Sequence, residues 1–246
     1  MDDSRLPHVE PPTIAVVGNG RLGNALVAAL PGLHGPFGRG FDGRSTEGVP
    51  FAAVLLAVPD SQIALAAGAV RPGPMVGHCA GAVGLDVLAP HEAFGVHPLM
   101  TITREGASFA GCGAAVAGTT DAALRLATDL AERLGMQPVH IADSDRAAYH
   151  AAASIASNFL VTLEDAAETL LATTGAPRSL LVPLVRASME NWAALGGRAA
   201  LTGPIVRGDE TVVARQRAAV AERTPELLAL FDELCARTRA LAERCR

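Results

Sequence analysis

The stretch TIAVVGNGRLGNAL, residues 13–26, decides the fold of this chain. It begins with the apolar run TIAVV, which is typical of a buried strand, and it ends in a helical pattern. Between the two lie Gly18, Gly20 and Gly23. In such a turn the first glycine makes the tight bend, the second lets the backbone approach a diphosphate, and the third lets helix and strand pack closely. The stretch therefore predicts a dinucleotide-binding turn.

The predicted turn would hold a diphosphate at the start of the helix, where free N–H groups and the helix dipole favour negative charge. A methyltransferase is the alternative use of a glycine-rich first turn, but this strand has no acid at its end. The residues expected to bind the cofactor here are Gly18, Asn19, Gly20, Arg21, Leu22 and Gly23.

The region about 20 residues further on predicts which dinucleotide is bound, because an acid there binds the 2′-OH of NAD and an arginine accommodates the 2′-phosphate of NADP. In LHGPFGRGFDGR, Arg39 stands at the expected end of the second strand, Arg44 follows, and the acid Asp42 lies in the loop. We therefore expect NADP rather than NAD, with a solvated Arg39 as the alternative. Val58 and Pro59, at the end of a later strand, are expected beneath the adenosine and ribose.

The order of apolar runs and helical patterns predicts the architecture. Short strands that are apolar throughout alternate with helices in the first part of the chain, which is typical of a parallel sheet covered on both faces. After Asp143 only helical patterns follow. We predict an α/β fold, with a Rossmann-type, doubly wound, mostly parallel sheet in residues 1–142 and an all-α domain in 143–246. The expected strands are 13–17, 51–58, 74–80, 93–98, 111–118 and 137–142, and the expected helices are 21–30, 60–70, 121–134, 144–174, 179–195 and 209–244.

Composition and charge narrow the class of protein. The chain has 246 residues, of which 50% are hydrophobic, and a net charge of −5 without a long basic run, so nothing indicates binding to nucleic acid or to a membrane surface. Its apolar runs are too short to span a bilayer, and its acidic, proline-rich start is unlike a signal peptide. The four cysteines lack the spacing of metal ligands or of a disulfide framework. We expect a cytoplasmic protein without a structural metal.

The helical stretch YHAAASIASNF, residues 149–159, carries a polar stripe. At about 100° per residue, His150, Ser154, Ser157 and Asn158 fall on one side of the helix. The stretch contains no Asp, Glu, Lys or Arg, so a solvated surface is the least favoured interpretation. A closed network in the core remains open, and we favour the wall of an active site.

Histidines at strand ends are candidate proton donors near neutral pH. His97, in FGVHP, lies just past the expected strand, at the edge where doubly wound sheets bind ligands, and His150 begins the polar stripe. His78 has the neighbours Gly77 and Gly81, which suggest close backbone approach to a nicotinamide. For each histidine, a core or capping role is the alternative.

Three further side chains are candidates for contacts with a ligand or a partner. Arg207, in the loop TGPIVRGD, would clamp a substrate carboxylate or remain solvated, and Asp209 after it is the expected N-cap of the last helix. Tyr149 is the sole tyrosine and lies beside the stripe, so it is a candidate donor to the substrate. Trp192 is expected in the core or at a dimer interface.

Together these motifs resemble a known superfamily, the 6-phosphogluconate dehydrogenase-like oxidoreductases, to which pyrroline-5-carboxylate reductase belongs. Four stretches are similar to a bacterial branch of Rossmann-like proteins with a C-terminal domain of unknown function (DUF2520-type): GHCAGA (77–82), FGVHPLMT (94–101), YHAAASIASNFLVTL (149–163) and ALTGPIVRGD (200–209). The resemblance implies NADP(H), hydride transfer to or from a C=O or C=N group, a small, carboxylated substrate, and a homodimer built on the C-terminal helical domain.

One difference from that superfamily bears on the chemistry. The β-hydroxyacid dehydrogenases carry a K-x-x-x-N motif with lysine as proton donor, whereas this chain has Ser154 and Asn158 at that spacing, and all 20 of its Lys+Arg residues are arginine. The candidate catalytic residues are therefore His97, His150, Ser154 and Asn158. We expect an NADP(H)-dependent oxidoreductase. A non-catalytic nucleotide-binding regulatory or scaffold protein and a deazaflavin–NADP oxidoreductase are the alternatives.

Overall fold

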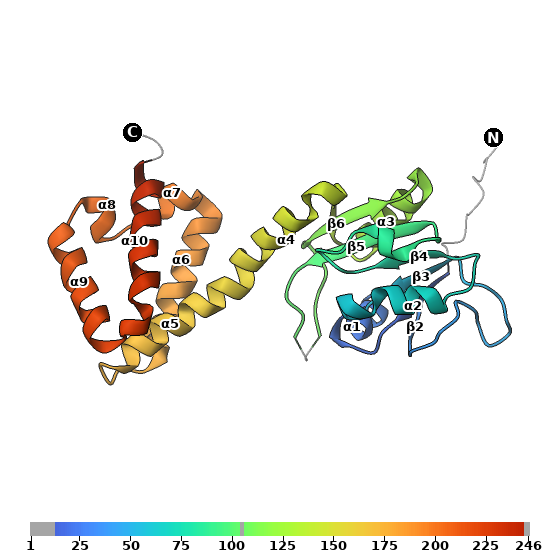
Figure 1. Cartoon of the computed structure of the whole chain (residues 1–246), viewed down its shortest axis with the longest axis horizontal. Coiled ribbons are helices and arrows are strands. Elements are labelled where there is room, and N and C mark those ends of the chain that lie inside the picture. Colours follow the sequence, from blue (N-terminus) through green and yellow to red (C-terminus); the bar gives the residue numbers. More distant parts are fainter. Residues whose placement is uncertain (1–12, 104–105, 244–246) are drawn as a thin grey trace, which may run out of the picture. The chain divides into compact units, whose positions relative to one another are not determined.

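The computed structural model describes residues 13–103 and 106–243, and the chain divides into two compact units, Met1–Ser157 and Asn158–Arg246 (Figure 1). The first unit contains a seven-stranded sheet, and the second consists of helices. The predicted fold class is confirmed. The sheet ends at His140, close to the expected domain boundary, and the first compact unit continues through helix α4 to Ser157.

The strand order in the sheet is β2-β1-β3-β4-β5-β6-β7. All neighbouring strands are parallel except β5 and β6, which are antiparallel, so the expected mostly parallel sheet is confirmed. The strands are shorter than most of the predicted runs. They are β1 (Ile14–Val17), β2 (Leu33–Phe37), β3 (Ala53–Leu56), β4 (Met75–His78), β5 (Ala93–Leu99), β6 (Gly113–Gly118) and β7 (Gln137–His140).

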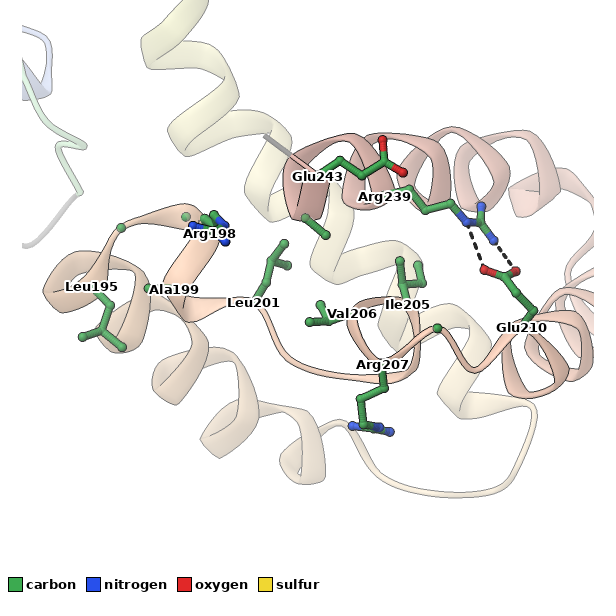
Figure 2. A pocket seen from close by; sticks show the side chains of 14 residues that line it. Leu195, Arg198, Ala199, Leu201, Ile205, Val206, Arg207, Glu210, Arg239 and Glu243 are labelled. Carbon is green, nitrogen blue, oxygen red and sulfur yellow. Dashed lines mark hydrogen bonds and ion pairs between the residues drawn. The ribbon is translucent and has the colours of Figure 1, made fainter. Parts of the chain in front are cut away.

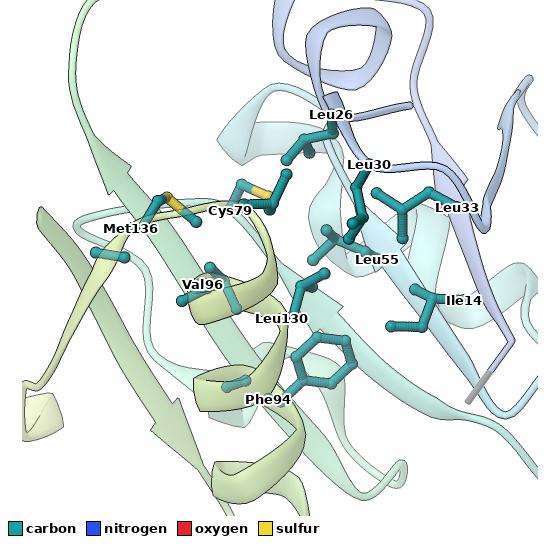
Figure 3. Packing of buried hydrophobic residues seen from close by; sticks show 14 of the residues in the cluster. Ile14, Leu26, Leu30, Leu33, Leu55, Cys79, Phe94, Val96, Leu130 and Met136 are labelled. Atoms are coloured by element: carbon teal, nitrogen blue, oxygen red, sulfur yellow. The ribbon is translucent and has the colours of Figure 1, made fainter. Parts of the chain in front are cut away.

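Helices cover both faces of this sheet. They are α1 (Arg21–Ala29), α2 (Ile63–Ala69) and α3 (Asp121–Arg133), with the 3-10 turns η1 (Asp60–Gln62), η2 (Leu85–Leu88) and η3 (Asp143–Asp145), and α4 (Arg146–Ser154) follows. Alternate residues of a strand face opposite sides. Ile14 and Val16 pack with α1 and α3 in one core (Figure 3), and Ala15 and Val17 pack with α2 in the other. Burial on both sides explains why the strands are apolar throughout.

The helical unit departs from the prediction at two places, the π turn within the predicted helix 144–174 and a break within the predicted helix 209–244. Its elements are the π turn η4 (Ile155–Phe159), which spans the unit boundary, α5 (Leu160–Ala172), η5 (Arg178–Leu180), α6 (Leu181–Leu195), α7 (Gly197–Ala200), α8 (Pro204–Arg207), α9 (Glu210–Arg223), η6 (Pro225–Leu227) and α10 (Leu228–Glu243). The single helix predicted over 209–244 is wrong, because Pro225 removes a backbone donor and Thr224 before it is not helical. The N-cap prediction is confirmed, since the Asp209 carboxylate accepts the N–H of Val212 at 3.1 Å.

The helical unit exposes large apolar side chains. Every residue of α6 is half-exposed or exposed, and Leu184, Trp192 and Leu195 are 63%, 58% and 59% exposed. Trp192 is therefore outside the core of its own unit. Despite this apolar surface, none of the helices within the described residues has the length and apolar character needed to cross a membrane.

We predict that Gly77→Ala destabilises the sheet. A Cβ at this position in β4 would lie 2.5 Å from ring carbons of Phe94, which is fully buried. Overpacking of this kind costs about 1–3 kcal/mol in the free energy of unfolding, measurable by urea denaturation. The control is Gly68→Ala in α2, where nothing lies within 4 Å, and where alanine should stabilise the helix by up to about 1 kcal/mol. An unchanged midpoint for Gly77→Ala would contradict the packing of β4 against Phe94.

Candidate functional site

A cavity of about 520 Å³ lies at the carboxyl ends of β1, β2 and β3. Its walls come from the turn after each of these strands and from one side of α2. The lining residues include Gly18, Asn19 and Gly20 after β1, Phe37, Arg39 and Phe41 at and after the end of β2, Ala57, Val58 and Pro59 after β3, and Gln62 and Leu65 at α2. Because β2 and β3 flank β1 on opposite sides, the strand order reverses at β1, which is where doubly wound sheets bind ligands.

The glycines of the first turn have different physical tasks. Gly18 has a φ of 121°, and a Cβ on it would strike the carbonyl oxygen of Ala57. A Cβ on Gly23 would strike the carbonyl oxygen of Gly18. A Cβ on Gly20, in contrast, would meet nothing within 4 Å. The protein's own packing therefore requires Gly18 and Gly23, whereas the backbone at Gly20 is left clear for a ligand.

The charges beside the cavity agree with the expected choice of cofactor. Arg39 lines the cavity just after β2, and in the part of the chain that the structure describes its guanidinium makes neither a hydrogen bond nor an ion pair. Asp42 is engaged elsewhere. Its carboxylate pairs with Nε of Arg71 at 3.1 Å and accepts the backbone N–H of Arg44 at 3.2 Å. A free cation and an occupied acid suit a phosphate better than a ribose hydroxyl.

The other residues expected to bind the cofactor divide into two groups. Val58 and Pro59 line the cavity. The side chains of Arg21 and Leu22 contact the protein, since Arg21 donates to the carbonyl of Ile102 at 3.0 Å and Leu22 packs against the core under α1. A contact of these two residues with the cofactor would therefore come from their backbone, at the start of α1.

A second cluster joins β5 to the start of α4. Nδ1 of His97 lies 2.9 Å from the hydroxyl of Tyr149, and the two rings meet edge to face at 85°. The ring of His150 is 6.0 Å from that of His97, centroid to centroid. All three residues belong to the first unit. The structure thus brings together three of the predicted site residues from positions more than 50 residues apart in the chain.

Glycines make room for this cluster. A Cβ on Gly81 would lie 2.7 Å from Cδ2 of His150 and 2.8 Å from Cε1 of His97. Gly77 is required by the ring of Phe94. The sequence suggested that both glycines admit a nicotinamide, but the structure gives each a packing role within the protein.

His78 is a buried structural histidine. Its side chain is 0% exposed, and its Nδ1 accepts the backbone N–H of Ala80 at 3.2 Å, so the hydrogen must be on Nε2, which donates to the carbonyl of Gly84 at 3.1 Å. Burial lowers the pKa of His78. Both ring nitrogens are engaged, so a contact between His78 and a cofactor would have to come from its backbone.

Arg146 is a member of the cluster that the sequence did not suggest. It is 4% exposed, its Nε pairs with Oδ1 of Asp143 at 2.6 Å, and a Cβ on Gly95 would lie 3.2 Å from its Nη2. Charged side chains are buried this deeply only when they are paired. Its spacing from Tyr149 and His150, which places all three on one helix face, is the signal that could have identified it.

Burial keeps His97 and Tyr149 neutral near pH 7, and positive charge adds to this effect at His97. Burial lowers the pKa of His97 to about 4, and the charges of His150 and Arg146 act in the same direction. Burial raises the pKa of Tyr149, although a hydrogen bond from the backbone of Ala115 and the charge of Arg146 oppose the increase. Near pH 7 the pair is therefore a neutral imidazole and a neutral phenol, which can exchange a hydrogen bond and a proton.

The remaining residues of the predicted stripe lie where α4 gives way to the π turn. Ser154 and Ser157 are half-buried, and Asn158 is exposed and belongs to the second unit. A π turn has i→i+5 hydrogen bonds, so the spacing of about 100° per residue assumed for the stripe does not apply over 155–159. With His150 also exposed, the described chain does not form the closed core network that was one of the alternatives.

Arg207 lines a separate cavity of about 850 Å³ in the helical unit, beside α8, α9 and α10. Figure 2 shows its side chain pointing away from Ile205 and from the ion pair in which Arg239 contacts Glu210 at 2.7 Å. Arg207 is thus an exposed arginine at the rim of this cavity. Within residues 13–103 and 106–243, no group of three His, Cys, Asp or Glu side chains is arranged to hold a metal ion.

Family models match two parts of the chain. Residues 112–238 match the model described as a domain of unknown function (DUF2520), and residues 47–103 match a Rossmann-like domain. The first match confirms the resemblance inferred from the motifs. A comparison with curated proteins found no match.

Several solved structures share the fold over nearly the whole chain. A protein from Thermotoga maritima is 22% identical with a TM-score of 0.79, covering 94% of this chain and 98% of its own. A Bacteroides fragilis protein described as a candidate NADP oxidoreductase is 18% identical with a TM-score of 0.74, covering 93% and 98%. Pyrroline carboxylate reductase from Plasmodium falciparum, with NADP bound, is 12% identical with a TM-score of 0.57, covering 95% and 99%. At these identities the likeness shows the fold alone.

We predict that stability falls in acid because of the buried histidines. The pKa of His97 is 6.5 in the unfolded chain and about 4 in the folded chain, so between these pH values the unfolded chain binds more protons. The contribution of His97 to the free energy of unfolding is therefore fully present above this range and is lost as the pH falls through it. The His97 contribution is on the order of 3 kcal/mol. Denaturation at several pH values should show a shallower acid loss for His97→Gln. The control is His140→Gln, at an exposed position on β7, which should keep the wild-type loss. Equal pH slopes for His97→Gln and wild type would contradict this assignment.

Proposed function

The chain belongs to the DUF2520 family, and from that premise we propose that it is an NADP(H)-dependent oxidoreductase acting on a small, carboxylated metabolite. Hydride would pass to or from a C=O or C=N carbon of that metabolite. The observation that carries the proposal is the cavity after β1, β2 and β3, with an open backbone at Gly20 and an unpaired Arg39 at its wall. Fold relatives that include a reductase with NADP bound support it.

The cavity residues fit each part of such a cofactor. The start of α1 and the backbone of Gly20 would hold the diphosphate, and Arg39 would pair with the 2′-phosphate. Val58, Pro59 and the 73% exposed Leu65 would contact the adenosine. When bound, the nicotinamide would supply the hydride.

The residues proposed to act on the substrate are those of the second cluster. Because the chain has no lysine, we assign the polarisation of the acceptor and the delivery of the proton to the histidines and the tyrosine. The contact of His97 with Tyr149, and His150 beside them, favour this cluster. Ser154 and Asn158 stay proposed catalytic residues, and Arg207 stays a proposed contact of the substrate.

We also propose that the helical unit forms a homodimer. Large apolar side chains that are exposed together mark an interaction surface, and α6 presents Leu184, Trp192 and Leu195 at intervals that place them near one helix face. A second copy of the same helices would cover them, which is the usual isologous arrangement.

Calorimetry with NADPH and NADH tests the cofactor proposal. Arg39→Ala should weaken NADPH binding by about 10- to 100-fold, the value of a charge-assisted hydrogen bond, and should leave NADH binding nearly unchanged. The control is Arg125→Ala, which removes an exposed arginine on α3 outside the cavity. Equal losses for both cofactors would show that Arg39 does not contact the 2′-phosphate. If the wild type bound neither cofactor at high micromolar concentration, the oxidoreductase proposal would fail.

The oligomeric state tests the dimer proposal. Leu184→Arg places a charge in the exposed apolar face of α6 and should convert a dimer into a monomer in sedimentation velocity at micromolar concentration. The matched control is Val49→Arg, at a 57% exposed position in the first unit, which should stay dimeric. A monomeric wild type would refute the proposal.

A further inference from the structure

The contact between His97 and Tyr149 joins two groups that can each pass a proton. We propose that they form a relay in which neutral His97 presents its Nε2–H to the substrate and Tyr149 supplies the replacement proton through Nδ1. This inference rests on the proposed oxidoreductase function and names the proton path that the missing lysine leaves open. His97 is then the catalytic residue, and Tyr149 acts through it.

The relay assigns a direction to the hydrogen bond between the two rings. The phenol of Tyr149 has one hydrogen, and Nδ1 of His97 lies 2.9 Å from its oxygen. In the proposed relay this O–H donates to Nδ1. A neutral imidazole that accepts at Nδ1 carries its hydrogen on Nε2. His97 is thus held in the tautomer that donates.

The donating nitrogen lies beside Gly81. A Cβ on Gly81 would lie 2.9 Å from Nε2 of His97, so any other residue would crowd this atom. Gly81 lies just beyond β4, at the edge of the sheet where doubly wound folds bind ligands, and His97 is half-buried. The relay places the acceptor at this edge, next to the Nε2–H.

The charges around His97 favour a neutral donor. His150 and Arg146 on α4 and His78 on β4 disfavour an imidazolium, whereas Asp60 in η1 favours it. Burial outweighs the carboxylate, and the imidazole is neutral throughout the physiological range. A neutral donor cannot be lost by deprotonation between about pH 6 and pH 8 in the way that an imidazolium is.

Arg146 offsets part of the cost of the phenolate that the relay creates. Burial raises the pKa of Tyr149 and so disfavours the phenolate, whereas the charge of Arg146, which is paired with Asp143, stabilises negative charge on the oxygen. The buried guanidinium therefore has a role in the proposed chemistry as well as in packing.

The proton transfer balances without a further reagent. As the oxygen or nitrogen of the acceptor gains negative charge, the Nε2–H bond of His97 breaks and a bond from that hydrogen to the acceptor forms. In the same step the O–H bond of Tyr149 breaks and an Nδ1–H bond forms. His97 stays neutral and Tyr149 becomes a phenolate. The pair is reset when Nε2 takes one proton from solvent and Nδ1 returns its proton to the phenolate.

Nitrogen NMR of the full-length protein without cofactor tests the tautomer. Long-range ¹H–¹⁵N spectra near pH 7 should show His97 neutral, protonated at Nε2 and hydrogen-bonded at Nδ1, with His97→Gln identifying its signals. In Tyr149→Phe the Nδ1 signal should move toward that of a ring nitrogen without a hydrogen bond. A His97 protonated at Nδ1, or doubly protonated, would overturn the relay. This measurement needs no turnover, so its outcome is independent of whether the protein proves to be an oxidoreductase.

The rate of NADPH oxidation with 1-pyrroline and with glyoxylate as probe acceptors tests the path itself. The wild-type kcat should be nearly constant between about pH 6 and pH 8, and Tyr149→Phe should lower kcat by about 100-fold with little change in KM. His140→Gln, on exposed β7, should match the wild type. An unchanged kcat in Tyr149→Phe, or a wild-type kcat that falls tenfold per pH unit, would overturn the relay. If neither probe is reduced, the NMR result decides it.

Discussion

The close approach of the first turn to β3 is the constraint on which the other features depend. Gly18 lies against the carbonyl of Ala57, and Gly23 lies against the carbonyl of Gly18, so α1 can begin only where both contacts are made. The N–H of Gly18 also donates to the carbonyl of Phe37 at 2.9 Å, which ties the turn to the end of β2. One glycine-rich turn therefore positions three walls of the cavity and the backbone from which Arg39 extends.

Glycines also make room for neighbouring groups at β4 and β5. Gly77 admits the ring of Phe94, Gly81 admits the two imidazoles, and Gly95 admits the guanidinium of Arg146. The glycines of the motifs GHCAGA and FGVHP thus leave space that larger side chains from other parts of the chain occupy. Arg146 and two histidines lie in these spaces, where burial first, and then the charges of His150 and Arg146, keep His97 neutral.

Much of the sheet was predictable because both of its faces are buried, and burial on both sides leaves continuous apolar runs in the sequence. The cavity was predictable from Gly18, Gly20 and Gly23. Arg146 was missed because a charged residue at a helix start is usually solvated. The break at Pro225 was predictable from the sequence, since proline removes a backbone donor within a helix. The exposed position of Trp192 was not predictable, since helical periodicity does not distinguish a core from a face that a second copy would cover.

The π turn at Ile155–Phe159 has a consequence for comparisons between relatives. A π turn accommodates one more residue than the α-helical turn it replaces. An alignment of this chain with a protein whose helix is regular therefore needs a one-residue gap inside 155–159. Without that gap, Asn158 shares a column with a residue that faces another direction, and an identical letter in that column no longer indicates an equivalent atom in space.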